Sequence, residues 1–349
     1  MPGRVVIFGW SDSAHIRRWV TGLKDRGWHI RLISQGGSRV PGIETFNLGQ
    51  YGRLSFFRYA SQATRLACEF KPDLIHVHYA GGFGWWGLRC KFAPLLVSVW
   101  GSDVIGLERN RPQWWLVRRV LRQATSISVT SQYLRGACNE LSGGIDEKIS
   151  VIPFGVSIPD LTAPLPPPPV RLCYIKFHRP QYGPDILLRA MTKVRIQIPD
   201  VRLTMAGDGD LTPELKRRCA ELGLEANVDF VGLIPNERIY SLLSDHHIMV
   251  MPSLAESFGV AVLEAGACGR PVIASRVGGV PEVLRDGETG LLVPPGDPTA
   301  LADAIIRLAG DRELCLQMGK AGRDFVAANY RWEHSLDCMH ALYERIIHG

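Results

Sequence analysis

The chain is divided by the stretch PFGVSIPDLTAPLPPPP, residues 153–169. Its seven prolines favour neither a helix nor a central strand, so the stretch is predicted to be a linker. On both sides of it, short runs of Val, Ile and Leu alternate with segments of helical periodicity. Such runs are typical of strands that are buried on both faces of a parallel sheet and separated by helices. The sequence therefore predicts an α/β chain with two doubly wound domains.

Each domain has its own set of predicted elements on one side of the linker. The predicted strands are 4–9, 30–34, 74–77, 95–99, 127–130 and 149–152 before it, and 170–175, 201–206, 228–231, 248–251 and 272–274 after it. Helices are predicted at 14–26, 184–195, 213–222, 236–244 and 259–267, and again from residue 298 onward. We expect an N-terminal domain over 1–160, a C-terminal domain over 161–330 and a final helix, 331–349, that packs back on the N-terminal domain. Ligands of such domains bind at the carboxyl ends of the strands, so we expect the reaction to take place between the two domains.

The composition is that of a folded globular protein. Of the 349 residues, 46% are hydrophobic and 21% are charged, and no apolar run reaches the ~18 residues that a membrane-spanning helix needs. The N-terminus has too short an apolar run for a secretory signal, so we expect a cytoplasmic protein. Eight scattered cysteines without a Cys-x-x-Cys pair predict reduced, apolar side chains and no zinc site.

Charge and tryptophan are concentrated in the first half of the chain. Residues 1–160 hold 20 Lys and Arg against 11 Asp and Glu, a net charge of +9, whereas residues 161–349 have a net charge of −3. Eight of the nine tryptophans lie at or before Trp115. One interpretation is contact with an anionic membrane surface, on its inner face, or with a phosphate-bearing lipid substrate. The other is that the tryptophans fill a core and the arginines are solvated. We expect no nucleic-acid partner.

The richest segment for chemistry is MPSLAESFGVAVLEAGA, residues 251–267. A strand ends at its start and a helix begins near Gly259, so the amides of Phe258, Gly259 and Val260 lie at a helix N-terminus that favours an anion such as a diphosphate. Glu256 precedes this helix and Glu264 lies inside it. Because carboxylates beside a phosphate are repelled by it, they suit the hydroxyls of a sugar. The alternative is a helix-capping Glu256 and a solvated Glu264.

At this point the sequence resembles the retaining glycosyltransferases of family 4. The resemblance is carried by the Glu-x7-Glu pair, formed by Glu256 of PSLAESFG (252–259) and by Glu264, and by the later motifs of the same half. These later motifs are GRPVIA (269–274), GGVPE (278–282), DGETGLLV (286–293) and GD (296–297). Looser matches in the first half are SAHIRRW (13–19), DLIHVH (73–78) and GSD (101–103). The resemblance implies the GT-B fold, two Rossmann-like domains facing each other across a cleft.

The resemblance also implies roles for individual residues. The donor, a UDP- or GDP-sugar, binds mainly to the C-terminal domain, where Glu264 holds the ribose hydroxyls and Glu256 the hydroxyls of the transferred sugar. The amide segment from Ser257 to Val260 completes this donor site. A basic pair near the start of the domain neutralises the diphosphate leaving group, where charge accumulates as the glycosidic bond breaks.

The sequence departs from the family pattern at two places. Tyr182 stands where a lysine is usual, so Lys176 and Arg179 are predicted to form the cationic pair, with Arg17 or Arg18 as the alternative. The second departure is Trp100, which replaces a histidine before Gly-x-Asp. A tryptophan transfers no proton but stacks on sugar rings, so Trp100 is predicted to bind the acceptor.

Further candidates lie in the N-terminal domain. Asp103 is predicted to contact donor or acceptor as part of the catalytic machinery, the alternative being a loop aspartate that caps a turn. Gly9 and Ser11 follow the first strand and are predicted to bring backbone amides to the donor phosphate. His15, one turn into the next helix, is predicted to touch the acceptor. The pair His76 and His78 has no third ligand nearby in sequence, so a role in loop structure or cleft lining is favoured over a metal site.

The predicted function is retaining glycosyl transfer from a nucleotide diphosphate sugar to an acceptor hydroxyl. The acceptor is expected to be a sugar or a lipid-linked molecule in cell-surface polysaccharide or glycolipid synthesis. No metal and no cofactor is expected, because the one Asp-x-Asp, at 208–210, suits a strand-to-helix turn better than a divalent ion. The alternatives are a non-catalytic nucleotide-sugar-binding subunit and another GT-B enzyme, such as a nucleotide-sugar epimerase or a phosphorylase.

Overall fold

The computed structural model describes residues 3–50, 52, 55–92, 94–160 and 163–349, and they form two compact units. Unit 1 comprises Met1–Pro153 together with Glu333–Gly349, and unit 2 comprises Phe154–Trp332. Leu161 and Thr162, within the predicted linker, lie outside the described residues. The last helix of the chain thus belongs to unit 1 although it follows unit 2 in sequence.

Unit 1 is built on a parallel sheet, which has seven strands among the described residues, in the order β3-β2-β1-β4-β5-β6-β7. The strands are β1 (Arg4–Phe8), β2 (His29–Ser34), β3 (Glu44–Asn47), β4 (Leu74–His78), β5 (Leu95–Val99), β6 (Ser126–Val129) and β7 (Ile149–Val151). The helices are α1 (Ala14–Asp25), α2 (Ser55–Glu69), α3 (Gly82–Arg89), α4 (Pro112–Gln123), α5 (Gln132–Ser142) and α13 (Trp332–His348).

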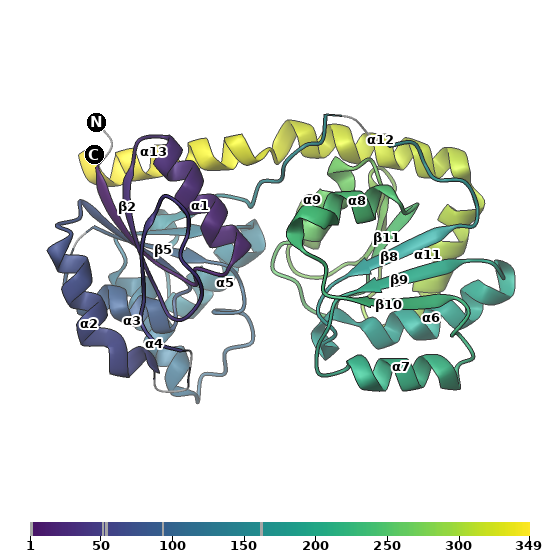
Figure 1. Ribbon diagram of the computed structural model, residues 1–349, viewed down its shortest axis with the longest axis horizontal. Coiled ribbons are helices and arrows are strands. Elements are labelled where there is room, and N and C mark those ends of the chain that lie inside the picture. The colour runs from purple at the N-terminus through teal and green to yellow at the C-terminus, as the bar shows by residue number, and fades with distance from the viewer. Residues whose placement is uncertain (1–2, 51, 53–54, 93, 161–162) are drawn as a thin grey trace. The chain divides into compact units, whose positions relative to one another are not determined.

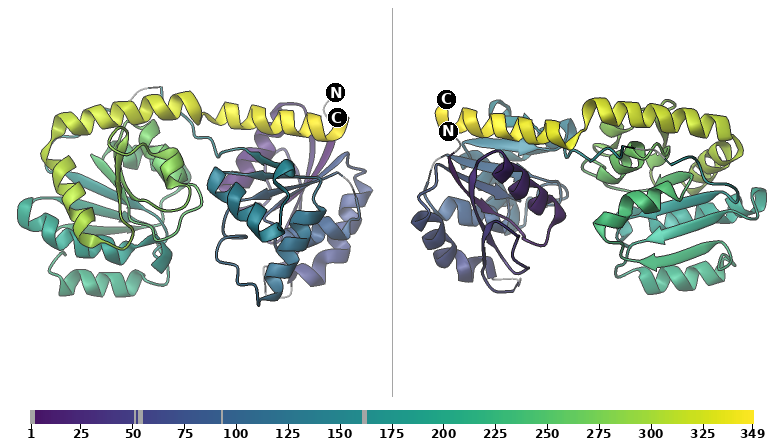
Figure 2. Two further views of the ribbon diagram at one scale, coloured as in Figure 1. Left: turned by 180° about the vertical axis from the view of Figure 1, so that it is seen from behind. Right: turned by 45° about the horizontal axis from the view of Figure 1, so that its top comes forward.

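Helices cover both faces of this sheet (Figure 1). On one face α3 lies between α2 and α4, and Phe83 and Trp86 of α3 are fully buried in the core. On the other face α13 lies beside α1. The two helices are so close at Gly22 of α1 that a Cβ there would meet the Leu336 side chain of α13. The indole of Trp28 is also hydrogen bonded to His340 of α13 over 2.9 Å. Figure 2 shows α13, in yellow, along unit 1 from two further sides.

Unit 2 repeats the same architecture with a parallel sheet in the order β10-β9-β8-β11-β12-β13. Its strands are β8 (Arg171–Ile175), β9 (Arg202–Ala206), β10 (Val228–Gly232), β11 (Ile248–Met251), β12 (Val272–Ser275) and β13 (Gly290–Val293). Its helices are α6 (Pro184–Gln197), α7 (Thr212–Glu221), α8 (Ile239–Ser244), α9 (Val260–Ala267), α10 (Val280–Val283), α11 (Pro298–Gly310) and α12 (Arg312–Asn329). Helices α6, α7 and α11 pack together, and α8, α9 and α12 form a second group (Figure 1).

Two doubly wound domains are therefore present, as the sequence predicts. The strand order reverses between β1 and β4 in unit 1 and between β8 and β11 in unit 2. The loops that follow these strands at their carboxyl ends are where such sheets bind ligands. Among the described residues, no helix has both the length and the apolar character needed to cross a membrane.

Candidate functional site

The strand reversal in unit 2 brings together two of the predicted site residues. Lys176 directly follows β8, and Glu256 lies in the loop after the neighbouring strand β11. Their side chains form an ion pair, with 2.5 Å between Nζ and Oε2, and only 17% of the lysine and 11% of the glutamate side chain is exposed. The Lys176 ammonium also lies 5.0 Å from the centre of the Tyr182 ring. The Lys176 ammonium and the Glu256 carboxylate thus lie together at the carboxyl edge of the unit 2 sheet.

Backbone contacts fix the two loops that carry this pair. Gly183, in the left-handed region with φ 62°, approaches so closely that a Cβ there would lie 2.1 Å from the Pro252 carbonyl oxygen. The Gln181 carbonyl accepts hydrogen bonds from the amides of Leu254, over 2.8 Å, and Ala255, over 3.3 Å. The loop after β8 and the loop after β11 are therefore packed directly against each other.

Helix α9 begins beside this pair. Gly259 is its N-cap with φ 104°, a conformation that few other residues adopt, and Val260 is its first residue. The Phe258 side chain is buried and packs on the rings of Phe154 and Tyr330, at 6.4 and 6.0 Å. This packing anchors the turn that aims the first amides of α9. The first amides of a helix favour an anion, and the Lys176 ammonium, paired with Glu256, follows β8 at the same edge of the sheet.

The other residues predicted for the donor site, Ser257, Glu264 and Arg179, differ in their burial and contacts. Ser257 is half-buried in the turn before α9, and Glu264 is half-buried as the fifth residue of the helix. Arg179 is exposed, and its guanidinium lies 5.4 Å from the centre of the Phe177 ring. Of the predicted cationic pair, the structure thus places Lys176 beside Glu256, while the contact shown for Arg179 is with Phe177.

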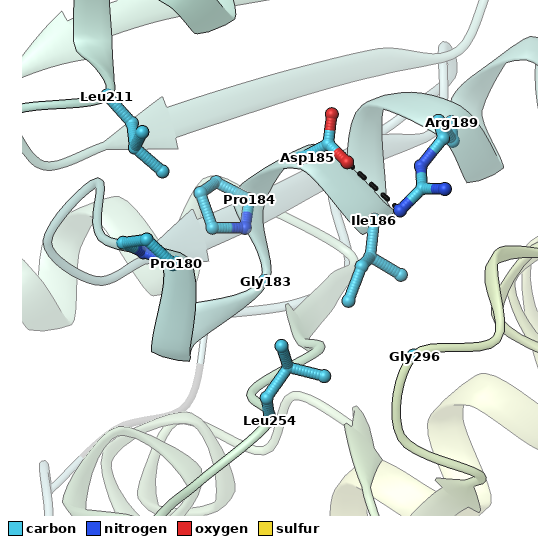
Figure 3. Close-up of a pocket in the computed structure, with 9 residues that line it drawn as sticks. All are labelled: Pro180, Gly183, Pro184, Asp185, Ile186, Arg189, Leu211, Leu254 and Gly296. Carbon is cyan, nitrogen blue, oxygen red and sulfur yellow. Dashed lines mark ion pairs between the residues drawn. The ribbon is translucent and has the colours of Figure 1, made fainter.

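A cavity of about 320 Å³ opens next to these loops (Figure 3). Its walls come from the turn before α6, the first turns of α6, and single residues of three other loops, as the sticks in Figure 3 show. The lining residues are Pro180, Gly183, Pro184, Asp185, Ile186, Arg189, Leu211, Leu254 and Gly296. Asp185 and Arg189 of this lining form an ion pair at 3.0 Å, and Asp185 also pairs with Arg218 at 2.9 Å. No predicted site residue lines it, so we do not assign it to the ion-pair site.

In unit 1, aromatic side chains gather at the carboxyl ends of β1, β4 and β5. The Trp10 ring lies 4.6 Å from that of Tyr79, and Tyr79 lies 4.8 Å from Trp100. His15, at the start of α1, meets Trp100 with 5.7 Å between ring centres. The predicted acceptor residues His15 and Trp100 are thus brought together. Trp10 and Tyr79 were missed by sequence reasoning, although a non-glycine residue with φ 73°, as at Tyr79, marks a strained and often functional position.

Asp103 organises the loop that carries Trp100. One carboxylate oxygen accepts a hydrogen bond from the Ala80 amide over 2.8 Å, and the other accepts from the amides of Trp100 and Gly101 over 3.2 and 3.0 Å. Burial raises the pKa of this carboxyl, and the backbone hydrogen bonds oppose that shift. These contacts are those of the turn-capping alternative, and the predicted catalytic contact of Asp103 stays a prediction.

Gly9 and Ser11 make packing and hydrogen-bond contacts within unit 1. A Cβ on Gly9 would lie 2.7 Å from the Ile16 side chain, so glycine lets α1 pack over the end of β1. Ser11 is fully buried, its amide donates to Ser34 Oγ over 2.9 Å, and its carbonyl accepts from Arg17 Nε over 2.7 Å. The donor-binding role predicted for Ser11 therefore has no support in its own contacts. Arg17, an alternative cation for the diphosphate, is bound to the same loop.

The two histidines of β4 differ sharply. His76 is fully buried, with Nδ1 2.5 Å from the Tyr343 hydroxyl and Nε2 2.6 Å from Ser98 Oγ. His78 is equally buried but has no hydrogen-bond partner at either ring nitrogen within the described residues. Within that part of the chain, no three His, Cys, Asp or Glu side chains lie close enough to hold a metal ion.

Comparison with known proteins covers both units. A family model described as "Glycosyl transferases group 1" matches residues 163–325, and one described as "Glycosyl transferase 4-like" matches residues 4–131. The N-acetyl-alpha-D-glucosaminyl L-malate synthase of Bacillus anthracis is 26% identical and aligns with 93% of this chain and 91% of its own.

Solved structures share the fold of the whole chain. Sucrose-phosphate synthase of Thermosynechococcus elongatus has a TM-score of 0.86 at 27% identity and covers 98% of each chain. HepE of Anabaena, solved with UDP and glucose, has a TM-score of 0.83 at 19% identity and covers 97% of this chain and 99% of its own. The chain therefore belongs to the GT4-type glycosyltransferases and has their GT-B fold.

Proposed function

We propose that this glycosyltransferase moves a sugar from a nucleotide diphosphate donor to an acceptor hydroxyl with retention of the anomeric configuration. The observation that carries the proposal is the Lys176–Glu256 ion pair beside the N-terminus of α9. Unit 2 is the donor domain in this proposal, with Glu264 on the ribose and Glu256 on hydroxyls of the transferred sugar. Unit 1 is the acceptor domain.

The ion pair has a direct use in this reaction. Before donor binds, Glu256 compensates the charge of a lysine that is largely withdrawn from water, which would otherwise be costly. When the donor binds, the ion pair separates. The Lys176 ammonium then binds the diphosphate, and the Glu256 carboxylate accepts hydrogen bonds from the sugar hydroxyls. Lys176 and the first amides of α9 then stabilise the charge that develops on the departing diphosphate.

Retention follows from front-face attack in this proposal. The acceptor hydroxyl approaches the anomeric carbon from the side of the leaving diphosphate, and a phosphate oxygen accepts its proton as the glycosidic bond breaks. This requires no protein nucleophile. It requires a stabilised leaving group and exclusion of water, so Lys176 has the largest predicted effect on the chemical step.

One of the compared proteins supports a nucleotide-sugar donor. HepE, which shares the fold, was solved with UDP and glucose. The name of the B. anthracis relative describes the synthesis of N-acetyl-alpha-D-glucosaminyl L-malate. We propose UDP- or GDP-sugars as the donors of this chain, and a sugar or lipid-linked acceptor in cell-surface polysaccharide or glycolipid synthesis.

We also propose peripheral contact with an anionic membrane surface through α4. Trp115 is 61% exposed, and Arg119 and Arg122, also exposed, follow it at helical spacing on the same face. A tryptophan flanked by arginines suits the interface of an anionic bilayer. Other N-terminal tryptophans have a different role, because Trp19, Trp28 and Trp86 are buried in the core.

Ligand-induced thermal stabilisation tests the donor assignment. UDP-, GDP- and ADP-sugars are compared on the wild type, on Glu264→Ala and on Glu214→Ala, a control at an exposed position of α7. A donor present at 100 times its Kd stabilises by about 2.7 kcal/mol, a shift of several degrees in Tm. We expect this shift in the wild type and in Glu214→Ala but not in Glu264→Ala. The absence of a shift with every donor would contradict the proposal.

A further inference from the structure

His78 is a buried polar side chain without a partner. Its relative exposure is 0%, and neither ring nitrogen has a hydrogen-bond partner among the described residues. The large majority of buried side-chain polar atoms in proteins are hydrogen bonded, and an unpaired one costs free energy. His76 is the internal comparison, because it is just as buried and both of its nitrogens are bonded, to Tyr343 and Ser98. Burial of β4 alone therefore does not explain why the ring nitrogens of His78 lack hydrogen-bond partners among the described residues.

The position of His78 points to a ligand. It is the last residue of β4, at the strand reversal of unit 1, where doubly wound sheets bind ligands. Its ring centre lies 5.0 Å from that of Trp100, and a Cβ on Gly9 would lie 3.6 Å from its own Cβ. Thr130, which follows β6 at the same sheet edge, is also buried with an unpaired hydroxyl. Two unsatisfied polar groups thus lie at the edge where a ligand is expected.

The chemistry of His78 selects among ligands. Burial, with the neighbouring His76 and His15, holds its pKa well below the usual value, so the ring is neutral at physiological pH. A neutral imidazole offers one donor and one acceptor. A hydroxyl group offers the same combination, whereas an ionised carboxylate accepts only and would face the unprotonated nitrogen with a lone pair.

We propose that His78 is an acceptor-binding residue that recognises a hydroxyl of a neutral polyol, a sugar or a cyclitol. This proposal rests on the proposed glycosyl transfer. It identifies the group of the acceptor that unit 1 binds, a hydroxyl. Trp100 covers His78 and His15 lies against Trp100. Trp100 turns aside when the polyol enters, and its ring then packs against the apolar face of the polyol.

Nitrogen-15 NMR of the full chain labelled at histidine tests this directly. The ring resonances of His78 are assigned from their loss in His78→Phe, and those of His76 from His76→Gln. The protein is titrated with myo-inositol, D-glucose and D-fructose, and in parallel with succinate and sulfate, two anions that carry no hydroxyl group. We expect at least one polyol to shift the His78 ring nitrogens strongly and those of His76 little, and we expect the anions to leave His78 unchanged.

Affinity gives the second measurement. The polyol that shifts His78 should bind about tenfold more weakly to His78→Phe, with partial recovery in His78→Asn, whose amide also donates and accepts. Polyols that leave His78 unshifted, equal shifts at His76 and His78, or unchanged affinity in His78→Phe would each overturn the inference. Because donor stabilisation is measured separately through Glu264, its loss would count against the proposed function and not against the role of His78.

Discussion

Single residues set the charge of the unit 2 site. Glu256 and Lys176 lie 80 positions apart and are each largely buried, so replacing either leaves its partner uncompensated. We expect Glu256→Gln and Lys176→Met each to lower kcat by about 10²-fold or more, the range found when one group that stabilises the transition state is removed. Nucleoside diphosphate release, followed under donor saturation, measures this.

The exposed ion pair of Lys193 with Asp303, also at 2.5 Å, is the matched control. Exposed pairs contribute little, so Lys193→Met should leave kcat within about twofold of the wild type. A similar loss of kcat in all three variants would show that the effect is structural and would remove Lys176 from the mechanism.

His76 makes the stability of unit 1 depend on pH. Burial lowers its pKa to about 3 in the folded chain, against 6.5 for an exposed histidine. The unfolded chain therefore takes up the proton first as pH falls, so stability is full above pH 6.5 and declines by about 1.4 kcal/mol per pH unit between 6.5 and 3. The raised pKa of Asp103 acts in the opposite direction, because the folded state then holds the extra proton.

The comparison of wild type with His76→Gln isolates this contribution. Between pH 7.5 and 5.0 the wild type should lose about 2 kcal/mol more unfolding free energy than the variant. Denaturant unfolding monitored by tryptophan fluorescence reports mainly on unit 1, where eight of the nine tryptophans lie. Identical losses in the two proteins would show that His76 is not held neutral by burial.

Not every residue of the site could be predicted. Glu256 and Glu264 stand out because two carboxylates flank a helix start within one short segment, and that information is local. The contact of Lys176 with Glu256 depends on which strands are neighbours, which the sequence pattern does not give. The unpaired state of His78 depends on packing from several elements, so the sequence yields only a buried-looking histidine.

At the scale of elements, the turn before α6 is the part that positions Lys176. Gly183→Ala would place a Cβ 2.1 Å from the Pro252 carbonyl oxygen and force the two loops apart. Gly287→Ala is the control, because its φ of 77° is equally left-handed but a Cβ there meets nothing within 4 Å. Both should lose about 1 kcal/mol from backbone strain, and only Gly183→Ala should also lose donor stabilisation. Equal donor responses in a thermal-shift titration would contradict this.

Two strands were missed for physical reasons. β3 (Glu44–Asn47) is a short edge strand without a continuous apolar run, and all four of its residues are exposed or half-buried. β13 (Gly290–Val293) is four residues long and follows a turn-rich segment, so it has too little periodicity to stand out. The central strands were predictable because both of their faces are buried and their residues are mostly apolar.

For the whole molecule, the charge difference between the halves leads to a membrane prediction. Trp115→Ser should reduce flotation with vesicles that contain anionic phosphatidylserine, because it removes the exposed aromatic group from the arginine face of α4. Leu233→Ser in unit 2 alters a side chain of similar exposure, 64% against 61%, and should float like the wild type. Flotation that does not depend on anionic lipid, or on Trp115, would refute the surface assigned to α4.

The central claim is retaining transfer from a nucleotide sugar, and proton NMR of the anomeric position tests it most directly. The protein is incubated with α-linked UDP- and GDP-sugars and with D-glucose, D-fructose or myo-inositol as acceptor. We predict that nucleoside diphosphate and a new α-glycoside appear together, and that Lys176→Met suppresses both. A β-linked product, or no release of nucleoside diphosphate from any donor, would contradict the account.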